Sequence, residues 1–138
     1  YEKYLAEANQ IFDSCFCKWD GKTTIYAKIM SPFDPRKIKG IVQFCHGMCE
    51  YFNKYEEFFK YLVENGYVVF GNDHIGHGNS AKNTSDLGFF GEDNGYNYFI
   101  DDVRKLYEFV REKYPYEKYF IIRFMVYYDS NILFTTYA

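Results

Sequence analysis

The sequence predicts an α/β fold, in which a parallel sheet carries helices on both faces. Three short apolar runs, at residues 41–45, 67–70 and 118–122, are typical of strands in such a sheet, and the first two of covered strands. Two segments between these runs repeat apolar residues at helical spacing. The order strand, helix, strand, helix, strand requires right-handed crossovers between parallel strands. At 138 residues the chain fits one domain.

An antiparallel hairpin is expected before these parallel strands. Residues 11–18 and 23–30 are strand-like, and the Asp20 and Gly21 pair between them supplies the positive φ angles of a tight turn. Two prolines, Pro32 and Pro35, then interrupt the pattern.

Each of the two helices is predicted from an apolar stripe with a terminator behind it. Asn65 and Gly66 end the first helix, and Pro115 stops the second. The first stripe consists of Tyr55, Phe58, Phe59, Leu62 and Val63, and the second of Phe99, Val103, Leu106, Tyr107 and Val110.

The composition argues against several classes of partner. Sixteen basic and 19 acidic residues are dispersed along the chain, so no basic stripe is present to bind nucleic acid. The longest apolar runs are far shorter than the roughly 20 residues of a spanning helix, so we expect no stable membrane insertion. Aromatic residues make up 23% of the chain, and their spacing favours packing over ligand stacking. We expect a cytoplasmic protein with reduced thiols.

Three loops follow the predicted parallel strands, at the edge where such sheets place their chemistry. The first begins at His46 and Gly47. A glycine directly after a strand allows a sharp turn, so the amide of Met48 could donate to an oxyanion. The alternative is an ordinary turn with His46 hydrogen-bonded in the core, and these residues alone leave the two equally supported.

The second loop, NDHIGHGNS, contains two of the three histidines beside a carboxylate. Asp73, His74 and His77 form one candidate zinc set, and the cysteines at 15, 17, 45 and 49 form another. However, Gly76 and Gly78 disfavour the helix that would place both imidazoles on one face. We therefore favour a scaffolding loop, in which Asp73 and the imidazoles hydrogen-bond the backbone, over a metal site.

The third loop lacks a nucleophile. A serine hydrolase places its serine on a strained turn after the third buried strand, as GxSxG. Residues 123–127 read RFMVY, with neither serine nor glycine. Ser130 is the nearest serine downstream and has no flanking glycines, so we interpret it as a helix-start or loop serine and only as a weak nucleophile candidate.

Taken together, these motifs resemble the α/β-hydrolase serine esterases of the monoacylglycerol lipase and lysophospholipase type, also called the serine aminopeptidase S33 domain. An HGxxE motif at residues 46–50 followed by DHxGHGxS at residues 73–80 is a specific pair. Tyr51, Lys54 and Ile75 stand where His, Arg and Arg are common. The resemblance covers about residues 13–122 and also includes residues 20–21, 25–27, 40–42, 54–55, 66–69, 87–88 and 114–115.

The resemblance implies the N-terminal part of an α/β-hydrolase fold and a small acyl-ester or lipid substrate. It also implies no metal or cofactor. Met48 would supply one oxyanion-hole amide, while His46, Gly47, Glu50, Asp73, His74, Gly76, His77, Gly78 and Ser80 belong to the shared motifs. The family's catalytic serine would fall at about residues 123–127, and its catalytic Asp and His beyond the chain.

We therefore expect residues 1–138 to form a single incomplete domain, with 123–138 outside the family pattern. The chain begins at Tyr1 rather than Met, which favours a fragment or a processed product. One hypothesis is a truncated or decayed hydrolase that is inactive, for example through a frameshift. The other is a short paralogue that binds a lipid or a partner without catalysis. An incomplete sheet leaves an open edge strand, which favours self-association.

Overall fold

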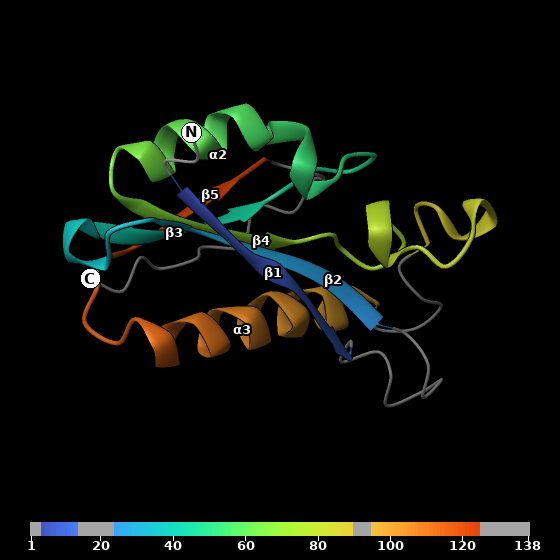
Figure 1. The fold of residues 1–138 in the computed structure, drawn as a ribbon. Coiled ribbons are helices and arrows are strands. Elements are labelled where there is room, and N and C mark those ends of the chain that lie inside the picture. Colours follow the sequence, from blue (N-terminus) through green and yellow to red (C-terminus); the bar gives the residue numbers. More distant parts are fainter. Residues whose placement is uncertain (1–3, 14–23, 90–94, 125–138) are drawn as a thin grey trace.

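The computed structural model describes the backbone of residues 4–13 and all atoms of residues 24–89 and 95–124. Five strands form one mixed sheet in the order β1-β2-β4-β3-β5. Figure 1 shows helix α2 over one face of this sheet and helix α3 over the other, as the sequence predicts. The strands are β1 (Tyr4–Asp13), β2 (Thr24–Pro32), β3 (Gly40–Cys45), β4 (Tyr67–Asn72) and β5 (Tyr119–Arg123), and the helices are α2 (Glu56–Glu64) and α3 (Gly95–Lys113).

The parallel part of the sheet agrees with the predicted elements. Strand β3 lies between β4 and β5 and runs parallel to both, and all six of its residues are buried. Apolar side chains from alternate positions form one cluster under each helix. The cluster beneath α3 contains Ala27, Ile29, Ile41, Val68, Phe70, Leu106 and Val110, and the cluster beneath α2 contains Met30, Val42, Phe44, Phe52, Phe59, Val63 and Val69.

The N-terminal antiparallel pair is confirmed, but the predicted bounds of its first strand are wrong. Strand β1 begins at Tyr4, well before residue 11, and a register shift between Glu7 and Gln10 interrupts its pairing with β2. Residues 4–10 contain no β-branched side chain, so β propensity alone does not predict a strand there. The expected turn at residues 19–22, with the flanking residues 14–18, lies outside the described part of the chain.

The apolar stripe of α2 is confirmed except at Phe58. Phe59 and Val63 are buried, whereas Phe58 is 42% exposed. Adjacent residues on a helix are about 100° apart, so Phe58 falls outside the narrow arc that faces the sheet. The helix ends as predicted, with Gly66 at a φ of +97°. A single turn of 3-10 helix, η2 (Phe52–Tyr55), precedes α2 and buries Phe52 completely.

The buried side-chain amide of Gln43 on β3 joins three elements. The Gln43 Nε2 atom donates to the carbonyl oxygen of Val103 on α3, at 2.9 Å. Its Oε1 atom accepts from the Tyr119 hydroxyl on β5, at 2.7 Å. Burial raises the pKa of Tyr119, which therefore stays a hydrogen-bond donor. A buried polar side chain at this point is stable because both ends of its amide are paired.

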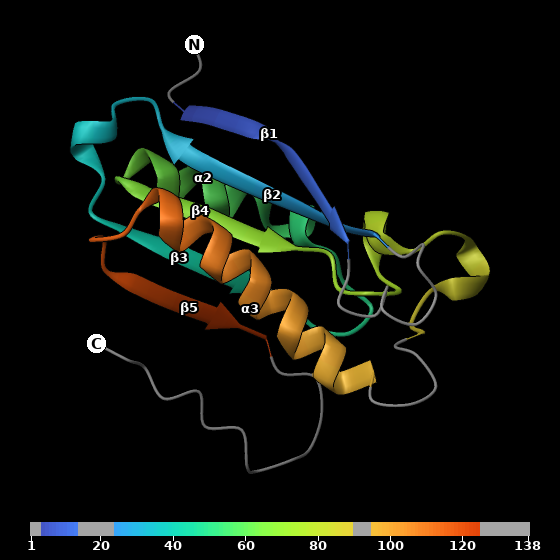
Figure 2. The same ribbon diagram turned by 90° about the horizontal axis from the view of Figure 1, so that it is seen from below.

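Strands β1 and β5 form the two edges of the sheet, on opposite sides in Figure 2. Unlike β3, β5 has no buried residue, and Phe120 on it is 46% exposed. Across the described residues, neither helix is long and apolar enough to cross a bilayer.

Candidate active-site loops

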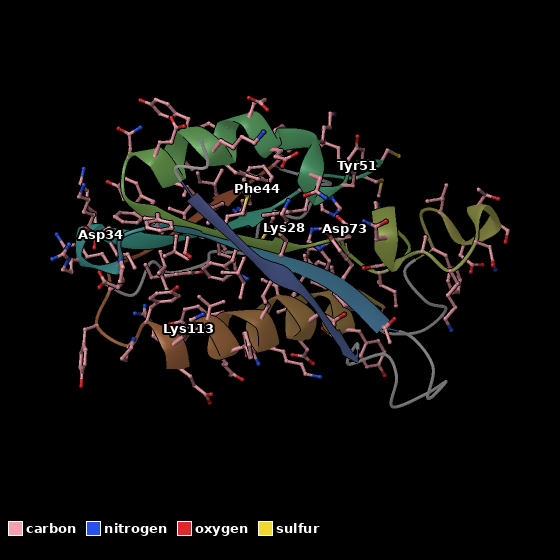
Figure 3. All side chains as sticks on the ribbon, in the orientation of Figure 1. Lys28, Asp34, Phe44, Tyr51, Asp73 and Lys113 are labelled. Carbon is pink, nitrogen blue, oxygen red and sulfur yellow. The ribbon has the colours of Figure 1, made fainter. Side chains whose placement is uncertain are left out.

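The loops after β3 and β4 meet at the carboxyl ends of the parallel strands, as predicted for sheets of this type. Figure 3 shows Tyr51 and Asp73 at this end of the molecule and Asp34 at the opposite end. His46, Asp73, His74, His77 and Ser80 of the two motifs are buried, and buried polar groups of this kind need hydrogen-bond partners.

The two loops are joined by a reciprocal pair of hydrogen bonds between His46 and His74. The backbone N–H of His74 donates to Nε2 of His46, at 3.0 Å. In return, Nε2 of His74 lies 3.0 Å from the carbonyl oxygen of His46. The ring centroids are 4.0 Å apart. This arrangement fixes the loop after β4 against the loop after β3.

The hydrogen-bond partners assign a neutral tautomer to each ring. Because Nε2 of His46 accepts, its proton lies on Nδ1, which donates to the Gly47 carbonyl oxygen at 2.7 Å. His74 carries its proton on Nε2, and its Nδ1 accepts from Asn72, at 3.4 Å. Burial lowers the pKa of His46 and lowers that of His74 well below its usual value. Both imidazoles are uncharged structural links at neutral pH.

Asp73 holds the start of η2 and the loop around residue 79 together. Its Oδ1 accepts from the Phe52 amide at 2.7 Å, and its Oδ2 from the Asn79 amide at 2.8 Å. The residue is 1% exposed. Its backbone carbonyl accepts from the Ser80 hydroxyl at 2.6 Å, and the Ser80 oxygen in turn accepts from the Tyr26 amide at 2.9 Å. The interpretation of this segment as a scaffolding loop is supported by these contacts.

The glycines of this loop are required by its conformation. Gly76 and Gly78 have φ angles of +71° and +46°, a region that other residues rarely adopt. A Cβ atom on Gly78 would clash with the Asp73 carboxylate. The ring of His77 folds back, with Nδ1 2.9 Å from the Ile75 carbonyl oxygen.

Glu50 orders the turn after β3. Its Oε2 accepts from the Gly47 amide at 2.9 Å, and its Oε1 accepts from Lys54 and from the Tyr55 hydroxyl, at 2.8 and 2.7 Å. Hydrogen bonds from Lys54, then Tyr55, lower the pKa of Glu50 to about 2. The carboxylate therefore stays ionised at neutral pH and keeps the Gly47 amide occupied.

The backbone N–H of Met48 is not hydrogen-bonded in the way that the neighbouring N–H of Gly47 is. Among the described residues, no acceptor engages this N–H, and Met48 is 41% exposed. The next residue, Cys49, has a φ of +59° and closes the turn. An oxyanion hole is built from backbone N–H donors that no acceptor of the protein occupies.

The candidate zinc residues do not gather into a ligand set. The Asp73 oxygens accept backbone N–H groups, and the nitrogens of His74 already have partners. Over the described residues, no three His, Cys, Asp or Glu side chains form a metal-binding group. Cys45 is buried and Cys49 exposed, while residues 15 and 17 lie outside the described chain.

Strand pairing continues at the point where the third loop is expected. The Phe124 amide donates to the Cys45 carbonyl oxygen at 3.1 Å. The Phe124 ring stacks on the Tyr55 ring, with the ring centroids 5.1 Å apart. Ser130 lies outside the described residues.

The sequence interpretation missed three partners of the motif residues, namely Tyr26, Phe52 and Tyr55. Tyr26 comes from β2, and Phe52 and Tyr55 come from η2, and none stands in a motif whose spacing indicates the contact. Gly71 is the one residue whose type could have indicated the position of Phe52, because a glycine inside an apolar strand indicates that another group packs closely against the backbone there. A Cβ atom there would clash with the Phe52 ring.

Comparison with known families gives a match over most of the described chain. The model of the family "Serine aminopeptidase, S33" matches residues 36–122. A comparison with curated proteins found no match.

Solved structures give the same result. A thermostable carboxyl esterase from Bacillus coagulans is 31% identical, with a TM-score of 0.71 over 88% of this chain. A lipase in its open form is 24% identical over 84% of the chain, and monoglyceride lipase from Saccharomyces cerevisiae 19% over 86%, with TM-scores of 0.69 and 0.66. The chain spans 36%, 36% and 35% of these proteins, respectively.

Proposed function

Because the chain belongs to the serine aminopeptidase S33 family and has the N-terminal part of an α/β-hydrolase fold, we propose that its loops are built for carboxylic ester hydrolysis. The substrate class we propose is a small acyl ester of the monoacylglycerol or lysophospholipid type. The observation that carries this proposal is the turn after β3, where Glu50 occupies the Gly47 amide and the Met48 amide stays open.

In this proposal Met48 provides half of an oxyanion hole. When a nucleophile attacks an ester carbonyl, negative charge develops on the carbonyl oxygen, and a preorganised N–H stabilises it by about 3 kcal/mol. His46 and His74 are not the base of the reaction, because both are buried, neutral and hydrogen-bonded through both ring nitrogens. Their role is to hold the turn that carries the open amide.

We further propose that this 138-residue chain does not hydrolyse esters by itself. Residues 123–127, RFMVY, offer no serine at the position of the family nucleophile. At Phe124 the backbone continues its pairing with β3, and the aromatic ring occupies the space beside Tyr55. An open amide without a nucleophile supplies transition-state stabilisation but no covalent step.

The test combines a short-chain p-nitrophenyl ester with a fluorophosphonate probe for reactive serines. We expect neither turnover above the buffer rate nor labelling of the purified chain. A Ser130→Ala variant serves as the matched control. Turnover and labelling that this substitution abolishes would show that Ser130 is a nucleophile and overturn the proposed inactivity.

A second candidate function is non-catalytic binding of an acyl chain, favoured by exposed apolar side chains at the carboxyl end of the sheet. Met48, Tyr51 and Phe124 are 41%, 48% and 48% exposed. Binding would raise the melting temperature as a long-chain fatty acid is added. A smaller rise in melting temperature for Phe124→Ser than for wild type would support acyl-chain binding. No rise for the wild-type chain would exclude it.

A further inference from the structure

The loops after β3 and β4 are joined through an acceptor that a single proton removes. Nε2 of His46 accepts from the backbone N–H of His74 at 3.0 Å, and Nδ1 of the same ring donates to the Gly47 carbonyl oxygen at 2.7 Å. Because Nδ1 already carries a proton, a second proton can bind only at Nε2. Two N–H groups would then face each other, and the hydrogen bond between the loops would be lost.

His74 can bind a proton without a comparable loss. Its Nε2 donates to the His46 carbonyl oxygen at 3.0 Å, and its Nδ1 lies 3.4 Å from Nδ2 of Asn72. The Asn72 side chain can rotate and offer its oxygen to a protonated Nδ1, at the loss of a long 3.4 Å contact with the Asp73 carbonyl oxygen. A backbone N–H has no such alternative. Of the two imidazoles, only that of His46 must therefore leave its place when it becomes charged.

We propose that His46 is an acid-sensitive latch between the two loops. Protonation of Nε2 turns the ring out towards the exposed turn at Met48 and releases the backbone N–H of His74. The opening is local, because the Asp73 carboxylate keeps both of its backbone N–H donors and neither of those bonds involves an imidazole. Acid therefore separates the two loops while the sheet beneath them stays folded.

The groups around the ring determine the direction of the pH dependence. Burial, the largest influence, lowers the pKa of His46 from its usual value of 6.5, the carboxylates of Asp73 and Glu50 act to raise it, and His77 acts to lower it. Once the ring turns out into water, its pKa returns to about 6.5. The closed arrangement therefore loses stability as the pH falls from about 6.5 towards the lowered pKa, by up to about tenfold for each pH unit.

Two further charged side chains belong to the elements beside these loops. Arg123, at the end of β5, stands opposite Cys45 in the register of the sheet. Helix α3 packs the uncharged ring of Phe99 on His74, with centroids 4.2 Å apart, and buries Asp102 one turn later. A cation disfavours a charged imidazole and a carboxylate favours one, so these two side chains act in opposite directions.

Hydrogen–deuterium exchange of the full chain between about pH 7 and about pH 5, corrected for the intrinsic exchange rate, tests the latch. We expect the protection of the His74 amide to fall by up to about tenfold per pH unit, while the amides of β3 and β4 keep theirs. His46→Gln offers an acceptor that does not titrate and should make this protection independent of pH. The matched control is His74→Gln, which leaves the latch in place and should keep the pH dependence.

A second measurement needs no substitution. In nitrogen NMR spectra of the chain with labelled histidine rings, Nε2 of His46 should gain its proton over the same pH interval in which the His74 amide loses protection. Ring protonation and amide protection that change at clearly different pH values would contradict the latch.

Three exchange results would also overturn the proposal. The first is a His74 amide whose protection stays constant over the whole pH interval in the wild-type chain. The second is an equal loss of protection in β3 and β4, because that would be global unfolding. The third is a pH dependence that persists in His46→Gln and disappears in His74→Gln while circular dichroism shows the native fold for both. None of these results depends on whether the chain hydrolyses esters.

Discussion

Replacing Asp73 by Asn tests whether the loop after β4 is held by its carboxylate. The substitution preserves size, but the Asn side chain has one acceptor and one donor end. One of the two backbone N–H groups, from Phe52 or Asn79, would then face an NH2 group. Hydrogen bonds to a charged group contribute about 1.5–3 kcal/mol, and an orphaned buried donor costs about 1–3 kcal/mol.

We therefore expect D73N to lower the free energy of unfolding by about 3 kcal/mol. With a urea m-value of about 2 kcal/mol per molar, the unfolding midpoint should fall by roughly 1.5 M. Circular dichroism in urea measures it at one fixed protein concentration, because self-association would change the apparent stability. The control is Asp101→Asn, whose side chain is 46% exposed and should change stability by less than about 0.5 kcal/mol. A loss below about 1 kcal/mol in D73N would refute the assigned role.

Three further predictions concern neighbouring residues. Because the folded pKa of Glu50 is about 2, its contribution is complete above its usual value of 4.5 and is lost as the pH falls towards 2. The stability difference between wild type and Glu50→Gln should therefore shrink over that interval, and parallel pH profiles would contradict this. Burial lowers the pKa of His74, so the unfolded chain takes up its proton first and stability falls as the pH drops below about 6.5. His74→Gln should reduce that pH slope by up to about 1.4 kcal/mol per pH unit, and an unchanged slope in chemical denaturation would exclude this origin. Gly78→Ala should cost about 2 kcal/mol more than Gly88→Ala, since both residues have positive φ but only the Gly78 Cβ atom meets a carboxylate; equal melting temperatures would remove the steric argument.

The strands and helices that could be predicted are those whose burial leaves a periodic pattern. Strand β3 is buried at every position and α2 on one arc, so apolar runs and stripes located both. Residues 4–10 of strand β1 left no such pattern, and their position follows from pairing with β2 rather than from their own sequence. Phe58 fits the stripe by spacing alone, and only the position of the sheet shows that it faces solvent.

The motifs of the site could be predicted from the sequence, but the residues that hydrogen-bond to them could not. Gly76 and Gly78 indicated a tight loop in place of a helix, and in the structure both glycines have positive φ angles. The reciprocal bonding of His46 and His74 joins residues 28 positions apart, and the Tyr26 amide reaches Ser80 across 54. Contacts at such separations depend on strand order, which a local pattern does not contain. The oxyanion role of Met48 stays a prediction.

The paired amide of Gln43 links the position of α3 to the position of β5. In the assembled sheet, α3 supplies the acceptor for the amide nitrogen and β5 supplies the donor for the amide oxygen. An arrangement that buries either group without its partner costs about 1–3 kcal/mol. A one-residue slip of β5 carries the same penalty, since Phe120 offers no hydroxyl. One side chain thus favours the arrangement in which α3 and β5 are both in place and disfavours the wrong strand alignment.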